Sequence, residues 1–149
     1  MKPFKKILVP TDFSPHSQEA LRTAVDVAQK YGASITLIHV YEPVAYTLPE
    51  GYVLVTPQQL VDLNSELERR LAKAKAEAVQ AGAREISTEL LQGPPPHEIV
   101  DFAQQKAMDL IVMGTHGRTG IKHTLLGSIA ERVLRKAACP VLTVKADER

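Results

Sequence analysis

The chain has one cysteine, no tryptophan and no long apolar run. The single cysteine, Cys139, excludes an intrachain disulfide framework and a zinc site built from several cysteines. The apolar run behind the basic start, residues 7–9, is too short for a signal peptide, and nothing approaches the roughly 20 apolar residues of a membrane span. We therefore expect a soluble, cytoplasmic protein without a membrane partner.

The chain also lacks an excess of charge of either sign. Eighteen basic residues face 17 acidic ones, which gives a formal net charge of +1. Because such a chain has no strong field to attract a polyanion, the balance argues against a protein that coats DNA or RNA. At roughly 100–200 residues per domain, residues 1–149 are expected to form a single domain.

Short apolar segments alternate along the chain with longer segments of helical periodicity. Strands are predicted at residues 7–9, 34–41, 86–91, 110–113 and 140–145. Helices are predicted at residues 15–31, 57–81, 94–107 and 128–136, and a loop at residues 42–55. This alternation favours an α/β fold: a single doubly wound, Rossmann-like domain whose five-stranded parallel sheet carries helices on both faces.

Capping residues mark the ends of two of these helices. Ser14 is expected to be the N-cap of the first helix, and Gly32 is expected to end it in a left-handed conformation. Thr56, Pro57 and Gln59 have the spacing of a capping box with proline at the first helical position. The boundaries of both helices are thus predicted from local chemistry.

Glycine is concentrated in one segment, which follows the predicted fourth strand. Half of the chain's eight glycines lie there, at positions 114, 117, 120 and 127. Glycine permits positive φ and lets a ligand approach peptide N–H groups closely, and a strand that leads through glycines into a helix is a ready anion site. Arg118, Lys122 and His123 add positive charge to the segment. The alternative is a flexible surface loop.

The fold class suggests where a ligand would lie. In doubly wound sheets, ligands bind at the carboxyl ends of the strands, at the point where the strand order reverses. Two such ends are unusual in this sequence: Pro10, Thr11 and Asp12 after the first predicted strand, and the glycine-rich segment after the fourth. Both are expected to belong to one site.

The spacing Gly114-x2-Gly117-x9-Gly127-Ser128 resembles that of the nucleotide-binding branch of the universal stress protein family. The resemblance covers the whole chain, and its combination of motifs is specific, whereas each motif alone is weak. Four further segments resemble the family. Residues 7–14 look like its first strand and acidic turn, and Gly93-x-Pro95-x3-Ile99 looks like the start of its third helix. Residues 109–114 look like its fourth strand, and residues 139–144 look like its closing strand.

The resemblance implies a sheet of the adenine nucleotide alpha hydrolase-like type, in the order 3-2-1-4-5, that binds ATP with Mg between strands one and four. Asp12 would hydrogen-bond the ribose or the adenine, and Pro10, Val40 and Met113 would line the adenine pocket. The glycines would bring backbone N–H groups to the phosphates, and Ser128 would add its hydroxyl. The residues expected to bind the nucleotide are Pro10, Thr11, Asp12, Val40, Met113, Gly114, Gly117, Arg118, Gly127, Ser128 and Ile129.

Several of these residues have a purely structural alternative. Asp12 can satisfy N–H groups near the start of the first helix. Ser128 lies three residues before Glu131, as the N-cap of a capping box does. Val40 and Met113 are of core residue types, and Cys139 is expected to be a packed small hydrophobe rather than a reactive thiol.

No general base or carboxylate pair stands out beside the glycine-rich segment, and phosphoryl transfer needs such groups. The sequence therefore favours an ATP-binding regulatory module of the stress response over an enzyme. Slow ATP hydrolysis and a structural homodimer without nucleotide are the alternatives. The resemblance also implies a homodimer through the fifth strand, Val141–Val144, which has little charge to protect it from edge pairing.

Overall fold

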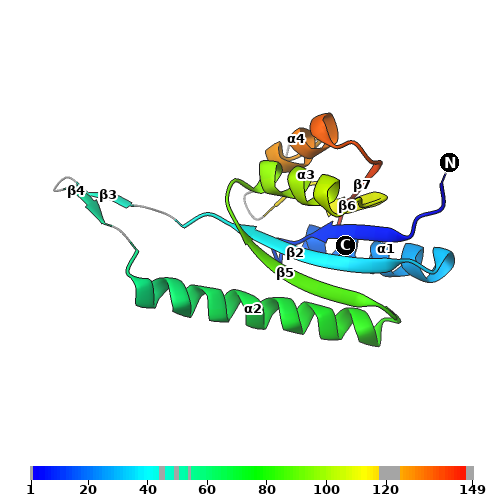
Figure 1. Cartoon of the computed structure of the whole chain (residues 1–149), viewed down its shortest axis with the longest axis horizontal. Helices are drawn as coiled ribbons and strands as arrows, with labels where there is room; N and C mark the ends of the chain where they lie inside the picture. Colours follow the sequence, from blue (N-terminus) through cyan, green and yellow to red (C-terminus); the bar gives the residue numbers. More distant parts are fainter. Residues whose placement is uncertain (1, 44–45, 49–50, 54, 118–124, 147–149) are drawn as a thin grey trace.

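Five parallel strands form one sheet at the centre of the structure (Figure 1). The computed structural model describes residues 2–43, 46–48, 51–53, 55–117 and 125–146. The strands pair in the order β5-β2-β1-β6-β7, so the predicted order 3-2-1-4-5 is confirmed. Their bounds are β1 Lys6–Pro10, β2 Ser34–Tyr41, β5 Ile86–Gln92, β6 Leu110–Gly114 and β7 Val141–Val144.

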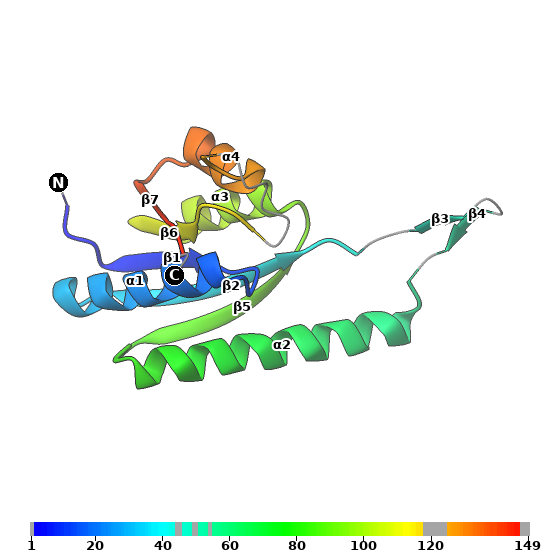
Figure 2. The same cartoon turned by 180° about the vertical axis from the view of Figure 1, so that it is seen from behind.

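Helices cover both faces of this sheet, as predicted (Figures 1 and 2). One hydrophobic cluster joins α1 and α2 to the sheet, and a second cluster joins α3 and α4 to its other face. Within the described residues, no helix combines the length and the apolar character needed to cross a membrane. The helices are α1 Pro15–Tyr31, α2 Pro57–Gln80, α3 Pro95–Gln105 and α4 Ser128–Lys136.

Strand β1 is apolar on both sides because both of its faces are covered by helices. Ile7 and Val9 belong to the cluster with α1 and α2, whereas Leu8 belongs to the cluster with α3 and α4. All three side chains are fully buried. This alternation follows from the two-residue period of a strand, and it explains why a continuous apolar run predicts a central strand.

The predicted caps of α1 and α2 are confirmed. The Ser14 hydroxyl accepts a hydrogen bond from the Ser17 N–H at 3.3 Å, and Gly32 ends α1 at φ +65°. Thr56 and Gln59 form both halves of the capping box of α2. Local sequence therefore determines where these two helices begin.

The segment between β2 and α2 is not simply the loop that was predicted. It contains a short antiparallel hairpin of β3 (Tyr46–Leu48) and β4 (Gly51–Val53). The hairpin projects away from the sheet (Figures 1 and 2). Tyrosine, threonine and valine in this segment favour strands. The nearby prolines and glycine suggest a loop, and the prediction followed the prolines and glycine.

The end of β6 lies directly against the first turn of α1. A Cβ atom placed on Gly114 would lie 2.8 Å from the Cβ of His16 and 2.9 Å from the His16 carbonyl carbon. Contacts this short require atoms to move, and here one of the atoms belongs to the backbone. Glycine at position 114 therefore allows the β6 and α1 backbones to approach, which positions the site described below.

Replacing Gly114 by alanine is expected to lower the free energy of unfolding by about 1–3 kcal/mol, the usual range for overpacking. Urea denaturation measures this change. Ser87→Ala, at an exposed position of β5, is the control and is expected to stay within about 0.5 kcal/mol of the unaltered chain. Equal stability of Gly114→Ala and the control would contradict the close approach.

Candidate functional site

A cavity of about 390 Å³ lies at the carboxyl ends of β1, β2 and β6, beside the starts of α3 and α4. Its volume is within the roughly 300–1,000 Å³ typical of small-molecule sites. Of the residues predicted to bind a nucleotide, all except Arg118 line this cavity: Pro10, Thr11, Asp12, Val40, Met113, Gly114, Gly117, Gly127, Ser128 and Ile129. Arg118 lies outside the described residues, as do Lys122 and His123.

The cavity also has lining residues that the sequence did not indicate as site residues. Pro95 and Ile99 reach it from the first turns of α3, because β5 ends at the same edge of the sheet as β1 and β6. The Pro94–Pro96 run after a strand is a signal that could have placed α3 there. The other unpredicted lining residues are Ser17, Thr115, His116, Leu126, Ala130 and Glu131.

One part of the cavity wall is apolar and packed into the core. Met113 is buried, and it belongs with Val40 and Leu126 to the cluster that α3 and α4 cover. Both Val40 and Met113 therefore have the core role that was considered for them, and both also line the cavity. Apolar walls with a few converging polar groups are typical of sites for small organic ligands.

Asp12 is the acidic group at the end of β1. Its Oδ1 accepts a hydrogen bond from the Ser14 N–H at 2.9 Å, so the alternative role near the start of α1 is correct. Its Oδ2 would lie 2.6 Å from a Cβ atom on Gly117. The Asp12 carboxylate thus lies between the turn after β1 and the segment after β6, and it is half-buried.

The turn after β1 has an unusual backbone conformation. Phe13 has φ +65°, in the left-handed region that bulky residues rarely adopt. Its N–H donates to the Thr11 hydroxyl at 3.0 Å, and that hydroxyl donates to the Ser17 hydroxyl at 3.1 Å. The Phe13 ring packs against His39, with ring centroids 4.7 Å apart. These contacts hold the turn that places Asp12 in the cavity wall.

The glycines of the site act differently from the expectation. Positive φ occurs at Gly32, Gly51, Gly82 and Gly93, but not at Gly114, Gly117 or Gly127. Instead, a Cβ atom on each of these three would meet other parts of the chain: His16, Asp12 and the Thr115 carbonyl oxygen, respectively. Glycine is therefore required here for close packing between segments, and not for left-handed backbone.

The structural alternative for Ser128, the N-cap of a capping box, is wrong. Gly127 is the N-cap of α4 and has extended backbone angles, so Ser128 is the first helical residue and the N-cap residue has no side chain to bond the first turn. The helix begins at Ser128, the predicted start, whereas a Ser128 cap would place its first residue at 129; the Gly127 N–H donates to the Thr115 carbonyl at 2.6 Å and fixes the chain at that point. The first turn of α4 borders the cavity, and the N–H groups at the start of a helix favour an anion.

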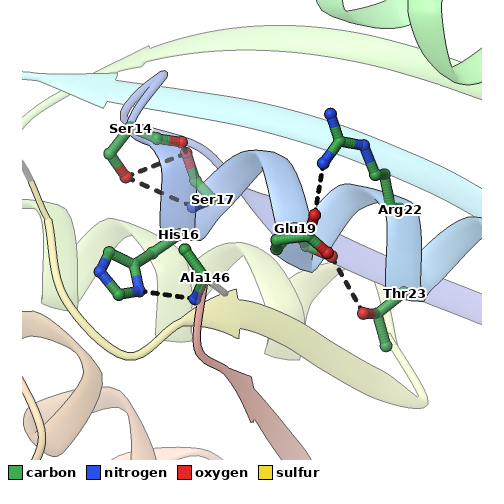
Figure 3. A network of polar contacts seen from close by, with 7 residues as sticks. All are labelled: Ser14, His16, Ser17, Glu19, Arg22, Thr23 and Ala146. Atoms are coloured by element: carbon green, nitrogen blue, oxygen red, sulfur yellow. Dashed lines mark hydrogen bonds and ion pairs between the residues drawn. The ribbon is translucent and has the colours of Figure 1, made fainter. Parts of the chain in front are cut away.

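A second polar cluster joins α1 to the segments after β6 and β7, and Figure 3 shows its contact between His16 and Ala146. Nδ1 of His16 accepts a hydrogen bond from the Ala146 N–H at 3.0 Å. The Thr115 hydroxyl lies 3.0 Å from Nδ1 of His116, and the ring centroids of His16 and His116 are 5.5 Å apart.

Across the described ranges, no three His, Cys, Asp or Glu side chains are grouped in a way that could hold a metal ion.

The model of the universal stress protein family matches residues 3–145. The chain belongs to the universal stress protein family. A curated relative, universal stress protein MJ0531 of Methanocaldococcus jannaschii, is 41% identical over 148 residues, which cover 98% of this chain and 85% of the relative. The resemblance inferred from the sequence motifs is thereby confirmed.

Two solved structures of universal stress proteins are similar to this one and contain a nucleotide. The first, a complex with cAMP, has a TM-score of 0.75 and 26% identity over 98% of this chain and 100% of that chain. The second, from Archaeoglobus fulgidus in complex with dAMP, has a TM-score of 0.68 and 26% identity over 97% of this chain and 100% of that chain. The fold of this family member is therefore one on which adenine nucleotides have been observed.

Cys139 is half-buried beside the cluster under α3 and α4. Burial raises the pKa of its thiol above the usual value, and the charge of Asp109 raises it further. Because the thiolate is the nucleophilic form, a raised pKa makes this cysteine less reactive near neutral pH. This agrees with the packing role predicted for Cys139.

Alkylation of Cys139 by iodoacetamide is therefore expected to be slower in the folded chain than in the urea-unfolded chain near neutral pH. As the pH rises toward the raised pKa, the thiolate fraction grows and the folded-state rate should increase. Mass spectrometry of the alkylated chain at a series of pH values measures both rates. A folded-state rate at neutral pH that equals or exceeds the unfolded rate would show an activated thiol instead.

Proposed function

We propose that this universal stress protein binds ATP, with Mg, in the cavity between β1 and β6, and that it acts as a nucleotide-dependent regulatory module of the stress response. The main support is that separate segments meet at one cavity. The ends of β1, β2 and β6 and the start of α4 all supply residues that were predicted to bind a nucleotide. The cAMP and dAMP complexes of similar family members support an adenine nucleotide as the ligand.

The two ends of the cavity suit the two ends of such a ligand. Pro10, Val40 and Met113 offer an apolar wall for the adenine, and the first turn of α4 offers N–H groups for phosphates. Mg²⁺ is usually bound through substrate phosphates with few protein carboxylates, which fits a cavity without a metal cluster among its described residues. Phosphates would therefore lie toward Gly117, Gly127 and Ser128.

Asp12 is proposed to hydrogen-bond the nucleoside. Its Oδ1 bonds the Ser14 N–H, which fixes the carboxylate before a ligand arrives, and a fixed group loses little entropy on binding. Thr11 and Ile129 would complete the walls beside it, and Arg118 would add positive charge from the segment after Gly117.

We propose that the protein is a nucleotide-binding module rather than an enzyme. Among the described residues, the titratable side chains that line the cavity besides Asp12 are His116 and Glu131. The Nδ1 atom of His116 lies at hydrogen-bond distance from the Thr115 hydroxyl. Phosphoryl transfer needs a positioned nucleophile and charge neutralisation together, so slow ATP hydrolysis is kept only as the alternative.

Calorimetric titration with Mg-ATP and with adenosine tests the two ends of the site. Asp12→Ala is expected to lower the affinity for both ligands by a similar factor, roughly ten- to hundredfold for a lost charged hydrogen bond. Gly117→Ala should also weaken both, because its Cβ atom would lie 2.6 Å from Oδ2 of Asp12 and displace the carboxylate. Ser128→Ala should lower the affinity for ATP by about fivefold and leave the affinity for adenosine unchanged.

Asp26→Ala is the matched control, because Asp26 is an exposed carboxylate of α1 away from the cavity. It should leave both affinities unchanged. Absence of binding heat for the unaltered chain with millimolar Mg-ATP would refute the nucleotide proposal and favour the structural-homodimer alternative.

We also propose a homodimer through β7. This strand is at the edge of the sheet, with β6 as its neighbour on one side. Leu142 on it is a large apolar side chain that is 38% exposed. An uncharged edge strand is a template for pairing with a second copy, so two β7 strands are expected to meet.

Sedimentation velocity tests this arrangement. The unaltered chain is expected to sediment as a dimer at micromolar concentration, and Leu142→Lys should shift it to a monomer, because a charge on an edge opposes pairing. Val79→Lys is the control: Val79 is an exposed apolar residue of α2, far from β7 in the fold, and this change should leave the dimer intact. A monomeric unaltered chain would contradict the proposal.

A further inference from the structure

A second cavity, of about 570 Å³, lies between α1 and α2 on the opposite side of the β1 turn from the first. We refer to it as the α1–α2 groove. Thr11 and Ser17 line both cavities, so the hydrogen bond between their hydroxyls forms part of the wall between them. Phe13, Leu21 and Val25 line it from the β1 turn and α1, and Arg70, Lys73 and Ala78 line it from α2.

The charged side chains that line the groove are mainly basic. Arg22, Arg70 and Lys73 are the cations, and Glu77 is the carboxylate. Arg22 points away from the His16 cluster and pairs with Glu19 on its own helix (Figure 3). Within the described part of the chain, no carboxylate lies within ion-pair distance of Lys73. Lys73 therefore offers the groove a cation outside the ion pairs of the described residues, and Glu77 is one turn further along α2.

Arg70 is shared between the groove and a neighbouring carboxylate. Its Nε lies 3.3 Å from Oε1 of Glu66, and its guanidinium carbon lies 5.7 Å from the centroid of the Phe13 ring. Hydrogen bonds from Arg69 and then Arg70 lower the pKa of Glu66, which keeps this side chain charged. Arg70 thus covers the aromatic end of the groove while it retains further donors for a ligand.

The floor of the groove is apolar. Leu21, Val25 and Ala78 are buried there and belong to the core cluster under α1 and α2. The long side chains above them carry methylene stems that extend this apolar surface up to their charged ends. A ligand in the groove would meet hydrocarbon along its length and positive charge at the rim.

We propose that the α1–α2 groove binds a small organic anion with an apolar body, of which a medium-chain carboxylate is the simplest example. The apolar body would lie along the floor formed by Leu21, Val25 and Ala78, and the anionic group would meet Lys73 at the rim, with Arg70 beside it. This site does not involve the phosphate end of the first cavity, and it does not depend on nucleotide binding.

The probe for this site is anilinonaphthalene sulfonate, whose fluorescence rises when its aromatic body enters an apolar site. The unaltered chain is expected to bind the probe, and decanoate should displace it. Lys73→Gln should weaken binding roughly five- to tenfold, the effect of one lost charge-assisted contact. Lys75→Gln is the matched control, since Lys75 is an exposed lysine two residues further along α2 and does not line the groove.

The comparison of the two lysine variants locates the probe. Equal binding by Lys73→Gln and Lys75→Gln would place it elsewhere and overturn the proposal. Displacement by inorganic phosphate as effective as that by decanoate would also overturn it, because a simple anion site would then explain the binding. Lys73 and Lys75 are both exposed, so neither substitution is expected to unfold the chain. Failure of Mg-ATP to bind would refute only the nucleotide proposal.

Discussion

The pairing of β1 with β2 on one side and β6 on the other is the constraint on which the site depends. The chain leaves β1 toward α1 on one face of the sheet and leaves β6 toward α4 on the other. The two exits diverge, so the carboxyl ends of these neighbouring strands border a cavity. Gly114 makes the arrangement possible, because α1 could not begin so close to the end of β6 beside a larger residue.

The turn after β1 connects the two cavities. Two consecutive residues of this turn line different cavities: Asp12 lines the first cavity, and Phe13 lines the α1–α2 groove. The Phe13 N–H donates to the Thr11 hydroxyl, which itself donates to the Ser17 hydroxyl. These bonds and the ring contact with His39 hold Phe13 in its left-handed conformation. A residue held in such a conformation is a common feature of functional turns, where neighbouring contacts compensate for the strain.

Much of the fold could be predicted because its signals are local. The apolar run Ile7–Val9 predicts a central strand, and Ser14 and Gly32 predict the ends of α1. The hairpin β3–β4 was missed because prolines and glycine mask its strand propensity. The functions of Gly114, Gly117 and Gly127 could not be predicted, since each depends on contact with a residue brought near only by folding. Likewise, Ser128 resembles an N-cap until the bond from Gly127 to Thr115 is known.

The proposed adenine nucleotide would lie between the β1 turn and the start of α4. Amide shift mapping by NMR during addition of Mg-ATP tests this placement, because each backbone N–H reports separately. Large shifts are expected for the amides of Asp12, Gly117 and Ser128, and small shifts for those of Lys73 and Glu77 in the groove. Unchanged amides at the first cavity at millimolar Mg-ATP, or shifts confined to other surfaces, would contradict it.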